Sequence, residues 1–247
     1  MMQENENNTP QSPVVLGFQN PMTRGETVAA LVYLVFHVAI IPLLLDRLIA
    51  YWPDGKISLV DSNLVYYAIG LIFMAVFLGR FYRRCFDRLA DHVGVTLLVL
   101  LASFALYYIL SIAVQFGVSA LLPEMSQSPN DETILAMATE SYGKTLAMSV
   151  ILAPLVEEPL FRGAVFGSLY KRGRVVAYVG SVLLFALLHV WQYAWTGGDS
   201  AVLLYTLLYI PASVALAYSY EKTSSIWTPV FFHMILNALS MYAMARM

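Results

Sequence analysis

The sequence predicts an all-α membrane protein, a bundle of about seven transmembrane helices around an intramembrane cavity. Apolar residue types make up 59% of the 247 residues, charged types make up only 12%, and the mean hydropathy is +0.67. Soluble domains contain about 25% charged residues, so this composition is typical of a membrane protein. The apolar stretches are long and continuous rather than alternating, which favours helices over a β-barrel.

Seven stretches are almost free of charged residues, and each can hold one spanning helix of about 20 residues. In chain order they are Thr27–Leu45, Ser62–Gly79, Val93–Leu122, Thr145–Tyr170, Val175–Gly198, Ser200–Tyr220 and Thr223–Ala245. Residues 1–26 are polar and lack the basic start of a signal peptide, so we expect a disordered or interfacial tail. A single helical domain then covers residues 27–247. In the longest internal connection, Pro129–Ala138 predicts a short, capped surface helix.

The positions of the positive charges predict the orientation in the membrane, because Lys and Arg are concentrated on the cytoplasmic side. Nine of them fall at one face of the predicted bundle: Arg24, Arg80, Arg83, Arg84, Arg88, Lys171, Arg172, Arg174 and Lys222. Four fall at the other face: Arg47, Lys56, Lys144 and Arg246. We therefore expect a multi-pass protein of the plasma (inner) membrane with a cytoplasmic N-terminus.

Two further features exclude other classes of protein. The net charge of −2 provides no basic surface for nucleic acid, so no nucleic-acid partner is expected. The single cysteine, Cys85, excludes a disulfide framework and a multi-cysteine zinc site.

Only three charged residues fall inside the predicted spans, and they lie together in the segment Glu157-Glu158-Pro-Leu-Phe-Arg162. An ionised residue at mid-membrane costs about 2.5–3.5 kcal/mol on insertion scales, so such groups are usually functional. A structural ion pair explains Glu158 and Arg162, which are four residues apart on one helix face. It does not explain Glu157, which projects about 100° away from Glu158 around the helix axis. Pro159 removes the helical hydrogen bond to the Leu155 carbonyl and favours a kink beside these carboxylates.

Two more polar clusters lie in the spans that follow, within a motif-bearing core at 144–245. They are Phe185-x-x-x-His189 and His233-x-x-x-Asn237. A lone membrane histidine is more often a helix–helix hydrogen bond, and that structural interpretation is kept for His37. Counted along the helices, however, Glu157, His189, His233 and Asn237 all lie roughly 17–22 Å from the basic loops. The sequence therefore predicts one shared cavity, which we expect to face the cytoplasm.

This set of side chains suits the hydrolysis of an amide bond. A carboxylate and an imidazole can hold and deprotonate a water molecule. A second imidazole and a carboxamide can donate hydrogen bonds to the developing oxyanion.

The three motifs resemble those of the CPBP family, the CAAX-protease and bacteriocin-processing intramembrane proteases, which include type II CAAX prenyl endopeptidases. The resemblance implies that Glu157 and His189 activate the water and that His233 and Asn237 bind the oxyanion. It also implies that Glu158, Arg162 and Phe185 support the site. The implied partners are membrane lipid and a peptide or protein substrate, including a lipidated C-terminal tail.

Other interpretations remain open at this point. No cofactor is firmly implied, but Glu157, His189 and His233 are also a possible zinc-ligand set, since members of the family are often described as metalloproteases. A non-catalytic scaffold or bacteriocin-immunity protein would use the same fold. A proton-coupled transporter would use the same buried groups.

Overall fold

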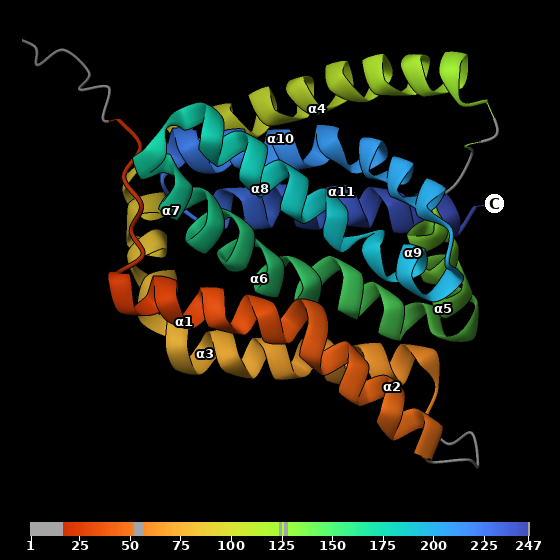
Figure 1. Ribbon diagram of the computed structural model, residues 1–247. Helices are drawn as coiled ribbons and strands as arrows, with labels where there is room; N and C mark the ends of the chain where they lie inside the picture. Colours follow the sequence, from red (N-terminus) through yellow and green to blue (C-terminus); the bar gives the residue numbers. More distant parts are fainter. Residues whose placement is uncertain (1–16, 52–56, 124, 126–127, 247) are drawn as a thin grey trace, which may run out of the picture.

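The computed structural model describes residues 17–51, 57–123, 125 and 128–246. All regular elements in these residues are helical, and the long helices run side by side along one bundle (Figure 1). The predicted all-α class is therefore confirmed. Residues 1–16 of the predicted tail and Lys56 lie outside the described residues.

The first half of the chain forms three long helical paths. They are α1 (Arg24–Val35), π-helix η1 (Phe36–Ile40) and α2 (Ile41–Tyr51) in one run, then α3 (Leu59–Asp91), then α4 (Val93–Leu121). Thr23 and Glu26 form a reciprocal capping box, so α1 begins before the predicted span. Helix α3 continues 12 residues beyond the predicted end at Gly79, since the basic segment that follows is also helical.

The fourth path contains the first motif and alternates between α- and π-helical turns. It runs through α5 (Pro129–Leu146), η2 (Ala147–Leu152), α6 (Ala153–Glu158), η3 (Pro159–Phe166), α7 (Gly167–Leu169) and the 3₁₀ turn η4 (Tyr170–Arg172). Ser128 caps α5, so the predicted capped start at Pro129 is confirmed, but the helix runs on to Leu146 and is longer than the predicted short helix over Pro129–Ala138. The π-helix η3 begins at Pro159, and the hydroxyl of Tyr82 on α3 donates a hydrogen bond to the Leu155 carbonyl that this proline leaves free.

The last part of the chain supplies the other two motifs. Its elements are α8 (Arg174–Leu188), α9 (Trp191–Gly197), the 3₁₀ segment η5 (Ser200–Tyr205), α10 (Thr206–Thr223) and α11 (Trp227–Met244). The stretch predicted as one straight span over Val175–Gly198 is bent by 46° between α8 and α9. The bend lies directly after His189, where Val190 leaves the helical conformation.

Helices cover all seven predicted stretches. Fewer than seven of these helices, however, are long and apolar enough to count as candidate membrane spans. Four qualify singly: Arg24–Leu45, Leu59–Asp91, Val93–Leu121 and Ser200–Thr223. The bent pair α8 and α9 is a fifth if it counts as one span. The chain is therefore a polytopic membrane protein, and the number seven stays a prediction. Helix α11 and the path through α6 and η3, which hold polar motif residues, are not among the five.

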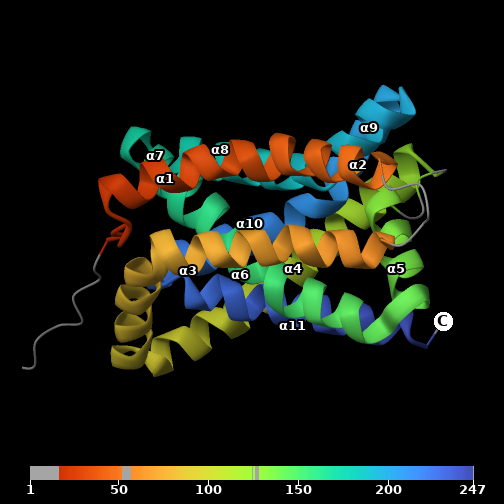
Figure 2. The ribbon, with the colours of Figure 1, turned by 90° about the horizontal axis from the view of Figure 1, so that it is seen from below.

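The two ends of the bundle are formed by different elements. One end, here called the basic end, holds α7, the start of α1 and the start of α8; the other, the α5/α9 end, holds α5, α9 and the end of α11 (Figures 1 and 2). The segment before α1 packs onto the basic end rather than standing free, since the Asn20 amide donates to the Gly163 carbonyl oxygen at 2.9 Å and the Phe18 ring contacts Phe166.

Candidate active site

The four residues that the motifs place at one membrane depth line a single cavity of about 820 Å³. Glu157 lies in the last turn of α6. His189 directly follows α8, and His233 and Asn237 lie four residues apart on α11. The cavity volume is within the usual range of small-molecule and peptide sites, about 300–1,000 Å³. The structure thus brings together residues from three helices that are up to 80 positions apart in the chain.

The Glu157 carboxylate is held by a hydroxyl group. Glu157 is 3% exposed, and the Tyr67 hydroxyl on α3 donates a hydrogen bond to its Oε1 at 2.7 Å. This bond leaves Oε2 for another partner in the cavity. The sequence alone did not identify Tyr67 as a site residue. It is a tyrosine in an apolar span, belongs to none of the motifs, and lies 90 positions before its partner Glu157.

Glu158 is the centre of a fully buried charged cluster. Its Oε2 lies 3.1 Å from Arg162 Nε, which confirms the predicted pair four residues apart. Its Oε1 lies 2.8 Å from Nδ1 of His233, a link between α6 and α11 that the sequence did not reveal. The Arg162 guanidinium sits 4.2 Å from the centre of the Phe185 ring, a cation–π contact, and donates to Ser213 Oγ on α10 at 3.3 Å.

Each histidine uses Nδ1 for a protein contact. His189 Nδ1 lies 2.9 Å from the Phe185 carbonyl oxygen, and because a carbonyl only accepts, Nδ1 carries the proton and Nε2 is left as an acceptor. The His189 ring stacks on Tyr209 at 4.5 Å. His233 points Nδ1 at a carboxylate, so Nε2 donates only when the ring carries both protons, and Glu158 is placed to balance that charge.

The Asn237 carboxamide is oriented by the backbone. Its Nδ2 donates to the carbonyl oxygen of Ser149 in η2 at 2.7 Å. A primary amide has two N–H groups, so one remains for a ligand in the cavity. The contact with Ser149 is a consequence of the π-helical stretch, in which carbonyl groups are not all used by regular i→i−4 bonds.

The zinc site that the sequence left open stays an alternative. In the part of the chain that the structure describes, no three or more His, Cys, Asp or Glu residues are grouped so that they could hold a metal ion. Glu157, His189 and His233 each bond to protein through one atom.

The cavity leads to the α5/α9 end of the bundle. Its exposed lining residues, such as Leu59, Leu135, Thr196 and Ser240, come from the start of α3, from α5, from α9 and from the end of α11. These elements lie away from the basic end (Figure 2). The expectation that the cavity faces the same side as the basic loops is therefore wrong. It failed because counting residues from the basic loops gives a depth in the bundle but not the end at which the cavity opens.

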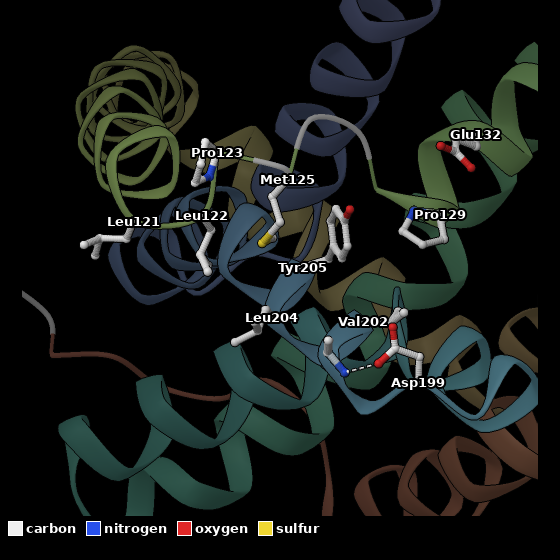
Figure 3. A pocket seen from close by; sticks show the side chains of 11 residues that line it. Leu121, Leu122, Pro123, Met125, Pro129, Glu132, Asp199, Val202, Leu204 and Tyr205 are labelled. Carbon is white, nitrogen blue, oxygen red and sulfur yellow. Dashed lines mark hydrogen bonds between the residues drawn. The ribbon is translucent and has the colours of Figure 1, made fainter.

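A second pocket of about 600 Å³ lies apart from the motifs (Figure 3). It is formed where the end of α4 meets the start of α5 and the 3₁₀ segment η5, and Asp199 caps that segment by accepting from the Ala201 amide at 2.8 Å. Leu121, Val202 and Leu204 make much of its lining apolar. It contains none of the predicted site residues.

Comparison with known proteins relates this chain to membrane peptidases. Residues 141–239 match the family model described as type II CAAX prenyl endopeptidase Rce1-like. A Bacillus subtilis (strain 168) protein named "Putative membrane peptidase YdiL" is 30% identical over 112 residues, which are 45% of this chain and 41% of that protein. The "Membrane-embedded CAAX protease MroQ" of Staphylococcus aureus (strain USA300) is 28% identical over 144 residues, 56% of this chain and 53% of that protein.

The matched segment spans about half the length of these curated relatives. No solved structure matches the chain significantly. The matched family segment nevertheless includes Glu157, Arg162, His189, His233 and Asn237, and therefore all three motifs. The resemblance predicted from the motifs is confirmed for this segment: residues 141–239 are similar to the type II CAAX prenyl endopeptidase Rce1-like family.

Proposed function

We propose that this protein is an intramembrane endopeptidase that hydrolyses a peptide bond with a water molecule activated by Glu157 and His189. The observation that carries the proposal is the meeting of Glu157, His189, His233 and Asn237 in one cavity, from three separate helices. The matched family and the two named relatives support peptide-bond cleavage as the activity.

In this mechanism, Glu157 accepts a proton from the water while Nε2 of His189 accepts a hydrogen bond from its second O–H group. The water oxygen attacks the substrate carbonyl carbon, and the negative charge that develops on the carbonyl oxygen is bound by Nε2–H of His233 and the free N–H of Asn237. When the C–N bond breaks, Glu157 returns the proton to the leaving nitrogen. Glu158, Arg162 and Phe185 hold His233 in place.

No step is routed through a metal ion, since the candidate ligands are not grouped as a metal site in the described residues. Metalloprotease chemistry is the alternative that a chelator tests. Proton-coupled transport, the other alternative, is not proposed, because the matched family and both named relatives are described as peptidases.

The orientation of the protein determines which peptides can reach the cavity. We infer that the basic end is cytoplasmic, since it holds most of the Lys and Arg residues. The cavity then opens toward the opposite side of the plasma (inner) membrane. Substrates would be peptides or proteins that enter from that side or laterally from the lipid. The apolar residues Leu45, Leu208 and Leu216 on the cavity wall are compatible with an apolar or lipidated chain beside the cleaved bond.

The proposal is tested with purified protein in detergent and a panel of quenched fluorescent peptides that includes a prenylated CAAX tail. We expect cleavage by the wild type, no cleavage by Glu157→Ala, and no effect of a strong chelator. Loss of activity with chelator and recovery with zinc would instead assign Glu157, His189 and His233 as metal ligands. Equal activity of wild type and Glu157→Ala would contradict the mechanism. A wild type that cleaves none of the panel while remaining folded would favour the non-catalytic scaffold or immunity protein.

A further inference from the structure

The hydroxyl group of Tyr67 contacts the carboxylate that the proposed mechanism uses as its base. Tyr67 lies on α3, outside residues 141–239, and belongs to none of the three motifs. We propose that Tyr67 is a positioning residue that orients the Glu157 carboxylate toward the catalytic water. This inference rests on the proposed endopeptidase function.

The close packing of α3 and α6 brings the two side chains together. Gly70 lies one turn after Tyr67 on α3, and a Cβ atom placed there would lie 2.8 Å from a methyl group of Val156. That distance is shorter than a real contact allows, so only glycine fits at this crossing. Val156 directly precedes Glu157. The approach of the two helices at Gly70 therefore places the Tyr67 hydroxyl within hydrogen-bond distance of the carboxylate.

Aromatic neighbours fix the Tyr67 ring. Tyr66 packs edge-to-face against it, with ring centres 4.9 Å apart, and His37 of η1 lies 6.0 Å away in a similar geometry. His37 also stacks on Tyr66 at 4.5 Å, and the Tyr66 hydroxyl donates to the His37 carbonyl oxygen at 2.8 Å. The two tyrosine hydroxyls thus point to different partners, one to a backbone carbonyl and the other to Glu157.

Among the residues that the structure describes, no ion pair of Glu157 fixes its direction. Arg162 is paired with Glu158 instead, and the bond from Tyr67 is the one side-chain hydrogen bond to Glu157 among the described residues. A carboxylate bound through Oε1 has its plane fixed, and Oε2 is presented to a water in the cavity. Catalytic bases are commonly oriented by a third group in this way, and loss of such a supporting contact usually lowers activity about 10–100-fold.

The test compares Tyr67→Phe with Tyr142→Phe, which removes a tyrosine hydroxyl that donates to the Met241 carbonyl oxygen from a side chain that does not line the cavity. We expect Tyr67→Phe to lower kcat about 10–100-fold with KM changed less than about twofold, because the substrate is still bound but the base is misdirected. Tyr142→Phe should keep kcat within about twofold of the wild type. An active wild type with equal kcat in both variants would overturn the inference while leaving the endopeptidase function intact.

A second measurement does not depend on activity. Thermal unfolding in detergent is compared for Tyr67→Phe made in the wild type and in a Glu157→Ala background. Loss of a hydrogen bond to a charged group should lower Tm by about 3–12 °C in the wild type. In the Glu157→Ala background the hydroxyl has lost this acceptor, so the same change should leave Tm unchanged or raise it. An equal decrease in both backgrounds would show that Tyr67 and Glu157 are not coupled and would overturn the inference.

Discussion

Replacement of Arg162 by methionine should destabilise the protein more than any other charge removal in the bundle. Arg162 is fully buried, its Nε lies 3.1 Å from Glu158, and its guanidinium lies against the Phe185 ring. Methionine fills similar space but leaves the buried Glu158 charge without its cation. Breaking a buried ion pair on one side typically costs about 3–5 kcal/mol. For a chain of this size, that corresponds to a decrease in Tm of about 6–20 °C.

The assay is thermal unfolding of the purified protein in one detergent, followed by tryptophan fluorescence. Arg172→Met is the matched control, since Arg172 is an exposed residue of η4 and the same change there should shift Tm by no more than about 2 °C. Combining Arg162→Met with Glu158→Gln removes the unpaired charge and should recover more than half of the lost Tm. If Arg162→Met were as stable as Arg172→Met, the reasoning about this charged cluster would be refuted.

Two further predictions concern the cavity. Asn237→Ala should lower kcat about 100–1,000-fold, because one donor to the oxyanion is lost; wild-type kcat in this variant would exclude the assigned role. In a Cys85→Ser background, a membrane-impermeant maleimide added to intact cells should label Ser240→Cys at the cavity mouth but label Lys171→Cys only after the membrane is permeabilised. The opposite pattern would reverse the inferred orientation.

Most of the fold could be predicted from where the charges are absent. The seven uncharged stretches match the helical paths because a membrane admits few structures other than continuous apolar helices. The bend after His189 could not be predicted, since no proline or glycine marks it and it depends on local turns at Val190. The π-helices could not be predicted either, although Pro159 correctly marked the point where α6 ends and η3 begins.

The candidate site, like the fold, could be predicted from the sequence only in part. Its motif residues could be found because charged and polar groups are rare in the spans, and the pair Glu158–Arg162 follows from helical spacing alone. The contacts of Glu157 with Tyr67 and of Asn237 with Ser149 could not be found, because they join different helices through common residue types. The direction in which the cavity opens depends on how the helix ends pack, which the count of residues from the basic loops does not determine.

The measurement that tests the central claim most directly is kcat/KM for Glu157→Gln, with Glu140→Gln as its control. Both variants exchange a carboxylate for an amide of the same shape, but Glu140 is an exposed residue of α5 that does not line the cavity. If Glu157 is the base, Glu157→Gln should lose at least about 100-fold in kcat/KM, while Glu140→Gln should match the wild type. Cleavage by Glu157→Gln at the wild-type rate would contradict the glutamate-activated water.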